Sequence, residues 1–187
     1  ADPSEQLIDF DGMGLIDLVV ERGADGLEEL PKSVRENEPA MAEAIENNIR
    51  KTIVDENPVN PKYYERMSVL LDELTALRRK QALSYQEYLE QIRDLAKRVQ
   101  KPSEATAFEY PMSIDSTAKK ALYDNFGKDE VLTTKIDTTV RHTKKADWLG
   151  DRFKEREIAL AIHEETAGYD LNVDEVMTLV KAQKEYH

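Results

Sequence analysis

The sequence predicts an all-α fold, a multi-helix bundle built around an antiparallel helical hairpin. Apolar residues recur at intervals of three and four along several segments, which is the spacing of an amphipathic helix. No two alternating segments joined by a turn signal indicate a strand pair. A chain of 187 residues can bury one sizeable core. We therefore expect a single helical domain over residues 1–187, with room for a second small helical lobe.

Two helices and a short helical stretch are expected in the first part of the chain. A turn at residues 10–14 leads into a helix that stops at Gly23, and a short helical stretch follows over residues 25–30. The second helix has an apolar residue at every fourth position, occupied by Met41, Ile45, Ile49 and Ile53. Two X-Pro steps then end it, because the residue before a proline is pushed out of the helical region.

The next two helices are expected to form the hairpin. Asn60 and Pro61 predict a helix start, since the Asn side chain can accept an orphan amide hydrogen bond and proline suits the first helical position. Ser84 and Glu87 form a capping box that starts the following helix. The apolar stripes of both have alternating spacings of three and four residues: Tyr63, Met67, Leu70, Leu74 and Leu77, then Tyr85, Tyr88, Ile92, Leu95 and Val99. The short connection between them predicts antiparallel packing.

The remaining chain predicts a loop and more helices. Residues 101–116 contain Pro102 and Pro111 and have no apolar period, so we expect a connecting loop between a first lobe over 1–100 and a second over 117–187. Helical apolar stripes in the second lobe cover residues 118–126, 132–140, 153–162 and 173–180.

The charge balance disfavours nucleic acid as an unaided ligand. The net charge is −12 and the isoelectric point is near 4.8, so the average field repels a phosphate backbone. Arg78, Arg79 and Lys80 form a basic group at an expected helix C-terminus, where cations complement the helix dipole. The alternative interpretation is that these three residues contact duplex DNA.

The known motifs of catalysis and cofactor binding are missing. The absence of cysteine excludes thiolate nucleophiles and cysteine-ligated metals. Gly127-Lys128 is followed by Asp129 rather than by the Ser or Thr of a phosphate-binding loop. No lysine has an acidic residue two positions before it, as magnesium-dependent nucleases of one common kind require. We expect no catalytic, cofactor-binding or metal-binding residue. Without a long apolar run or a signal peptide, we expect a cytoplasmic protein.

Three segments carry a family resemblance: IDFDGMGLIDLVVERG at residues 8–23, ENNIRK at 46–51 and NPKYYERMS at 60–68. On these segments, of which the third is the most specific, the chain resembles the C-terminal region of the R subunit of type I restriction-modification enzymes. Looser similarity continues in ALYDN at residues 121–125 and in Asp147-Trp148.

The resemblance implies a functional setting. A complete R subunit of this family has a magnesium-dependent nuclease domain, two RecA-like ATPase lobes and a helical C-terminal part. The ATP and magnesium sites would therefore lie upstream of this chain. Because the sequence starts at Ala1 without an initiator Met, we expect a fragment of a larger protein. The resemblance implies a non-catalytic domain that assembles with the methyltransferase and specificity subunits and with the upstream R-subunit domains, and that meets DNA only indirectly or weakly.

Candidate contacts to a partner are aromatic and polar residues: Asn47, Arg50, Lys62, Tyr64, Tyr123 and Trp148. Aromatic anchors among polar residues are typical of protein interfaces. Tyr63 belongs to an apolar stripe and is expected in the core, so Tyr64 beside it is expected at the surface. An intramolecular bond or a partner contact would equally explain Asn47 and Arg50. For Trp148, the alternatives are an anchor of its own loop and an interface residue.

Overall fold

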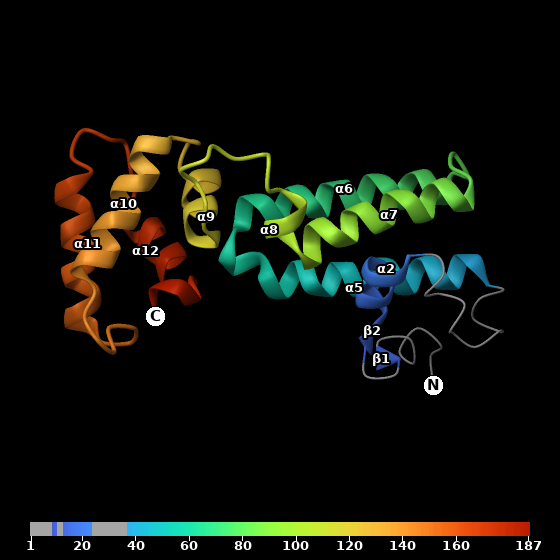
Figure 1. Cartoon of the computed structure of the whole chain (residues 1–187), viewed down its shortest axis with the longest axis horizontal. Helices are drawn as coiled ribbons and strands as arrows, with labels where there is room; N and C mark the ends of the chain where they lie inside the picture. The colour runs from blue at the N-terminus through green and yellow to red at the C-terminus, as the bar shows by residue number, and fades with distance from the viewer. Residues whose placement is uncertain (1–8, 11–12, 24–36) are drawn as a thin grey trace. The chain divides into compact units, whose positions relative to one another are not determined.

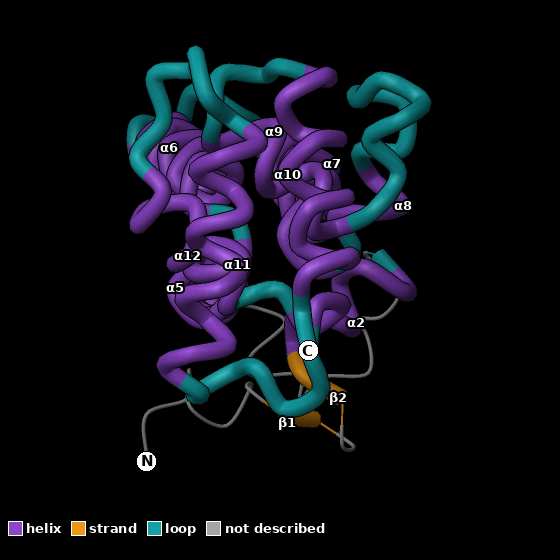
Figure 2. The backbone as a smooth tube through the Cα atoms, turned by 90° about the vertical axis from the view of Figure 1, so that its left-hand side faces the viewer, coloured by secondary structure: helices purple, strands orange, loops and turns teal. Residues whose placement is uncertain are grey.

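A computed structural model of the chain describes residues 9–10, 13–23 and 37–187, and it is all-α as predicted (Figure 1). Helices provide almost all of its regular structure (Figure 2). The α-helices are α2 (Leu15–Arg22), α5 (Glu38–Glu56), α6 (Pro61–Arg79), α7 (Tyr85–Gln100), α8 (Pro102–Ala105), α9 (Thr117–Asn125), α10 (Glu130–Thr143), α11 (Arg152–Glu165) and α12 (Val173–Lys181). Two short 3-10 helices are η1 (Asn57–Val59) and η2 (Lys184–Tyr186).

Two very short strands precede α2, where the sequence predicts only a turn. β1 (Asp9–Phe10) and β2 (Met13–Gly14) pair antiparallel, with Phe10 opposite Met13. The expectation that no strand pair occurs is wrong at this point, because two residues on each side are too few for an alternating pattern. The helical stretch predicted over residues 25–30 lies outside the described residues.

The chain divides into two compact units, each of which is described by itself. Unit 1 contains the described residues up to Glu56 and those from Tyr64 to Thr106, and unit 2 contains Asn57–Tyr63 and Ala107–His187. The connection between α5 and α6 therefore belongs to unit 2, together with α9 to α12. The loop predicted over residues 101–116 contains the helix α8 and the point at which the chain passes into unit 2.

Unit 1 contains the predicted hairpin. α6 and α7 run antiparallel beside each other, joined at residues 80–84 (Figure 1). The capping box is confirmed on one side, since the Ser84 hydroxyl accepts a hydrogen bond from the Glu87 amide at 3.1 Å. α2 packs against both α5 and α7. The fully buried side chains of this core include Met41, Ile45, Ile49, Met67, Leu71, Tyr88 and Ile92.

The buried face of α6 differs from its predicted stripe. Leu71 is fully buried, whereas Leu70 is half-buried and Leu77 is 40% exposed. α6 packs against α5 as well as α7, and two ion pairs to α5 lie along it: Arg78 with Glu46 and Arg50 with Asp72. A helix with two neighbours buries the side chains that point toward either of them. The predicted stripe assumed that α6 has one neighbour, so it did not include all of the buried residues.

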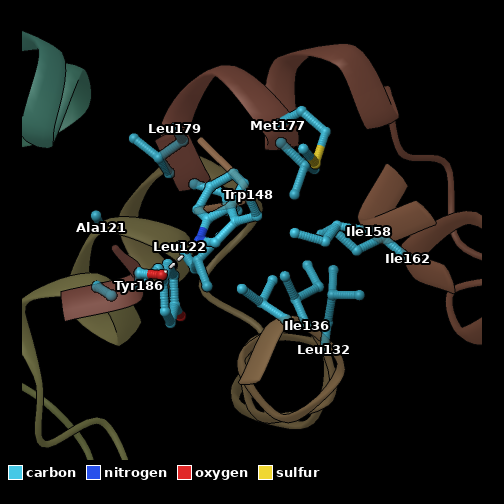
Figure 3. Packing of buried hydrophobic residues seen from close by; sticks show 14 residues of the cluster. Ala121, Leu122, Leu132, Ile136, Trp148, Ile158, Ile162, Met177, Leu179 and Tyr186 are labelled. Atoms are coloured by element: carbon cyan, nitrogen blue, oxygen red, sulfur yellow. Dashed lines mark hydrogen bonds between the residues drawn. The ribbon is translucent and has the colours of Figure 1, made fainter. Parts of the chain in front are cut away.

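Unit 2 has a core contributed by α9, α10, α11, α12 and η2 (Figure 3). Trp148 lies among Leu122, Ile136, Ile158 and Leu179 in this view, and α10 and α11 pack against each other along their length. Asp129, Asp151 and Asn172 cap helices α10, α11 and α12 through hydrogen bonds to their first-turn amides. Phe153, which the sequence places on the apolar stripe of α11, is instead 78% exposed.

Candidate functional site

A buried polar cluster in unit 1 is centred on Glu46, the first residue of the ENNIRK segment. The Glu46 carboxylate lies on α5 and is 5% exposed. Arg78 from α6 binds it in a bidentate manner, Nε to Oε2 at 2.7 Å and Nη2 to Oε1 at 2.9 Å. The Tyr88 hydroxyl from α7 donates to Oε2 at 2.7 Å. One carboxylate therefore holds three helices together, because each of its donors comes from a different helix.

The electrostatics of this cluster follow from its burial. Hydrogen bonding to Glu46 raises the pKa of Arg78, so its guanidinium stays charged. Burial, followed by the charge of Glu46, raises the pKa of Tyr88 far above its ordinary value of 10. Burial also raises the pKa of Tyr85, whose ring stacks on Tyr88 with centroids 6.3 Å apart, to about 12. Arg78 therefore stays charged and Tyr88 and Tyr85 stay neutral across the physiological pH range, as expected of groups with a structural role.

The three residues proposed for DNA contact differ in exposure, because one of them belongs to this cluster. The Arg78 side chain is only 15% exposed and is bound to Glu46, whereas Arg79 and Lys80 are exposed. A phosphate could reach Arg78 only by displacing a buried carboxylate, which costs several kcal/mol (about 3–5). The interpretation of Arg78, Arg79 and Lys80 as one DNA-contacting group therefore loses one of its three residues.

The candidate partner residues near Glu46 have different surroundings. Tyr64 is 4% exposed, so its predicted surface position is wrong. It faces the core of unit 1 because the buried face of α6 is rotated from the predicted stripe. Arg50 is exposed and pairs with Asp72 at 2.8 Å, which favours the intramolecular interpretation. Asn47 and the side chain of Lys62 are exposed and remain candidates.

A second polar network in unit 2 holds the α5–α6 connection. Asn60 is 7% exposed; its side chain donates to Asp124 Oδ2 at 2.8 Å, and its Oδ1 accepts from Asn125 at 2.8 Å and from the Tyr63 amide at 3.2 Å. The Asn125 Oδ1 also accepts from the Lys62 amide at 3.2 Å. Two of the segments that carry the family resemblance, NPKYY and ALYDN, are therefore hydrogen-bonded to each other within unit 2.

A third cluster lies at the C-terminal end of unit 2. The Tyr186 hydroxyl donates to Asp137 at 2.5 Å, and the Arg141 Nε lies 3.1 Å from the same oxygen. The Trp148 indole donates to the Tyr186 carbonyl at 2.7 Å. Trp148 is 2% exposed, so the structure favours the loop-anchor interpretation over an interface role. Tyr123 is half-buried with its ring edge against Tyr110, 5.9 Å between centroids.

Replacing Tyr186 by Phe should reveal the buried phenol as a pH-dependent contribution to stability. Burial and the bond to Asp137 raise the pKa of Tyr186 well above its ordinary value of 10. Its contribution is complete below pH 10 and is lost as the pH rises, because the unfolded phenol then ionises while the native one stays protonated; the slope is about 1.4 kcal/mol per pH unit. We expect Tyr186→Phe to be about 1–3 kcal/mol less stable at pH 7 and the difference to shrink above pH 10. Denaturant unfolding measured by Trp148 fluorescence tests this, and a constant difference from pH 7 to pH 11 would contradict it.

Unit 2 has more exposed large apolar side chains than the described part of unit 1. Of ten such exposed side chains in the described residues, three belong to unit 1 and seven to unit 2. The seven are Phe108, Met112, Val131, Leu149, Phe153, Leu160 and Tyr169. Scattered apolar residues are normal on a surface, whereas Phe108 and Met112 have relative exposures of 102% and 97%, so nothing in the described part of unit 2 covers them.

The loop that presents Phe108 and Met112 is anchored from within. Between them, the Tyr110 hydroxyl donates to Asp124 at 2.5 Å, and the Lys120 ammonium lies 5.3 Å from the Tyr110 ring centroid. After them, Ile114 is 2% exposed and its amide donates to the Pro111 carbonyl at 2.9 Å. Sequence reasoning missed these two residues because the loop has no apolar period. No periodic signal in the sequence marks their exposure.

A groove follows the outer face of α10 beside this loop. It has a volume of about 510 Å³ and is lined by Ser113, Glu130, Val131, Thr134, Lys135, Thr138, Thr139 and Glu165. The Ser113 hydroxyl hydrogen-bonds Glu130, so the end of the loop lies against the first turn of α10. Three threonines of α10, Thr134, Thr138 and Thr139, belong to this lining, whereas Thr133 is buried.

Within residues 9–10, 13–23 and 37–187, no cluster of three or more His, Asp or Glu side chains has the geometry to hold a metal ion. No helix in the same ranges combines the length and apolar character that crossing a bilayer requires.

Comparison with known proteins adds no identification, since no protein-family model, no curated protein and no solved structure matches this chain.

Proposed function

We propose that this chain is a non-catalytic, helical C-terminal domain of a cytoplasmic type I restriction enzyme R subunit. In this proposal it mediates assembly with the methyltransferase and specificity subunits and adjoins the upstream domains of its own R subunit. ATP and magnesium are bound by those upstream domains. The resemblance in residues 8–23, 46–51 and 60–68 supports the family, as stated above.

The observation that carries the assembly role is the distribution of exposed apolar side chains. Glu46 and Asn60, two polar residues of the family-like segments, are engaged in clusters that hold elements of their own unit together. Seven of the ten large exposed apolar side chains among the described residues belong instead to unit 2. Apolar and aromatic side chains at the centre of a contact are what protein interfaces use. Unit 2 is therefore the part of the chain that supports a protein partner.

Co-elution with the methyltransferase–specificity core tests this role. An equimolar mixture of the chain and the purified core of the same restriction system should elute in size-exclusion chromatography as one complex, earlier than either component. Separate peaks at micromolar concentrations would count against the proposal. Duplex DNA serves as the control ligand. Because the chain has a net charge of −12, we expect no stable complex between the chain and DNA at about 0.15 M salt.

A further inference from the structure

Helix α11 has one face that the described residues of unit 2 leave uncovered. Ile158 and Ile162 point into the core and are fully buried, whereas Phe153 and Leu160 are 78% and 52% exposed (Figure 3). Phe153 and Leu160 are seven residues apart, or about two turns, so they share one side of the helix. α11 therefore has a second apolar strip on the side away from the core.

Charged residues border this strip, basic on one side and acidic on the other. Arg156 follows Phe153 by three residues and Glu157 follows it by four, so they lie on opposite sides of the line from Phe153 to Leu160. The same spacing extends each row along the helix, and all members are exposed: Arg152, Arg156 and His163 on one side, and Glu157 and Glu164 on the other. We call the apolar strip and these two rows the α11 outer face.

The charged rows are available to a partner. Within the described part of the chain, no ion pair involves Arg152, Arg156 or Glu164. Glu157 pairs with Lys145 at 2.9 Å, and the two side chains are 47% and 60% exposed. An exposed pair of this kind stabilises by no more than about 1 kcal/mol, and the Glu157 carboxylate can accept a second cation.

The other charged residues near α11 lie outside the outer face. Lys154 donates to a carbonyl of the preceding loop at 2.8 Å, and Glu155 accepts from an amide of that loop at 2.9 Å. Asp147 and Asp151 precede the helix, and Asp151 caps its first turn. Glu165 lines the groove of α10. These neighbours leave the basic row and the acidic row as they are.

We propose that the α11 outer face is the contact between two copies of this chain, packed with their α11 helices side by side and roughly parallel. A two-fold axis parallel to both helices places the apolar strip of one copy against that of the other. It also turns the basic row of each copy toward the acidic row of its partner, so that Arg156 faces Glu157 of the other copy. An antiparallel pair would instead bring rows of like charge together. The face is thus complementary to itself, and this inference is independent of the proposed function.

The contact is small, so the complex is expected to be weak. One helix face covers less area than the about 1,600 Å² of a standard stable interface, and we expect a dissociation constant on the order of 0.1 mM. The full chain should be followed by sedimentation velocity from about 5 to about 500 µM, in about 0.15 M salt to screen its net charge of −12. The weight-average mass should rise with concentration from 21.4 kDa towards twice that value.

Two matched variants test the apolar strip. Phe153→Ala with Leu160→Ala should weaken self-association at least about tenfold, because both copies lose their central side chains. Phe108→Ala with Met112→Ala removes two exposed apolar side chains of unit 2 outside α11 and should change self-association less than about twofold. Both variants should keep the wild-type circular dichroism and Trp148 fluorescence, since all four altered side chains are exposed.

A charge exchange tests the arrangement of the two copies. Arg156→Glu alone and Glu157→Arg alone should each weaken self-association at least about threefold, because each places like charges opposite one another. An equimolar mixture of the two single variants should associate about as strongly as the wild type, since the exchanged charges then face each other. The two changes cancel in the net charge of the mixture, so general repulsion does not explain a recovery.

Several results would overturn the inference. A wild type that remains at 21.4 kDa over the whole range does so. Self-association that is unchanged in the Phe153 and Leu160 variant, or lost equally in the Phe108 and Met112 variant, does so too. A mixture no stronger than its components removes the parallel pairing on which the inference rests. If the wild type is monomeric and the Phe153 and Leu160 variant binds the methyltransferase–specificity core more weakly, the outer face belongs to that core; the inference then falls and the proposed function stands.

Discussion

Replacing Glu46 by Ala is expected to destabilise unit 1 by about 3–5 kcal/mol, one of the two largest effects of a single substitution in this chain. The change leaves the mostly buried guanidinium of Arg78 without a counter-ion and removes the acceptor 2.7 Å from the Tyr88 hydroxyl. An unpaired buried charge costs far more than the net benefit of the pair, because the remaining group cannot regain its hydration. Urea unfolding followed by far-ultraviolet circular dichroism measures the loss.

The neighbouring ion pair provides the control for Glu46→Ala. Arg50 and Asp72 also join α5 to α6 at 2.8 Å, but their side chains are 45% and 63% exposed. Asp72→Ala should therefore cost no more than about 1 kcal/mol. Equal losses in the two variants would show that burial does not distinguish these pairs, and the structural role of Glu46 would have to be abandoned.

Replacing Trp148 by Ala is expected to destabilise unit 2 by about 3–5 kcal/mol. Its ring fills the centre of the unit 2 core, and its indole satisfies the Tyr186 carbonyl at 2.7 Å (Figure 3). Truncation removes buried apolar area, leaves a cavity and deprives the carbonyl of one donor, although Lys144 still reaches it at 3.1 Å. Thermal unfolding by circular dichroism is the suitable measurement, because Trp148 is the only tryptophan in the sequence and its fluorescence is lost with it.

Phe153→Ala is the matched aromatic control in the same unit. Because Phe153 is 78% exposed, we expect a change within about 0.5 kcal/mol. A large loss in Phe153→Ala, or a small one in Trp148→Ala, would contradict the assignment of Trp148 to the core. It would also return Trp148 to the set of candidate interface residues.

Local sequence rules predicted the elements of this fold well. The Asn60-Pro61 start of α6, the Ser84 cap of α7 and the helical hairpin are all present in the structure. Such features depend on residues within a few positions of one another, where hydrogen-bonding and backbone preferences act directly. The two-residue strands β1 and β2 are too short to leave a periodic signal.

Features that depend on distant residues were not predictable in this way. Tyr64 is buried because α6 has two neighbours, and a periodic stripe cannot indicate how many helices cover it. The bond between Asn60 and Asp124 joins residues 64 positions apart. Glu46 reads as a surface residue in the sequence, since Glu is rarely buried unless paired, and its partners lie on other helices. The exposure of Phe108 and Met112 could not be predicted either, because both lie in a loop without a helical apolar pattern.

The segment from Glu46 to Tyr63 thus contributes mainly to architecture, and the account assigns partner recognition to another part of the chain. Hydrogen exchange of backbone amides with and without the methyltransferase–specificity core is the most direct test of this assignment. We predict that adding the core slows exchange within residues 107–187, which belong to unit 2, and leaves residues 46–56 unchanged. Slower exchange in residues 46–56 with no change within residues 107–187 would contradict it.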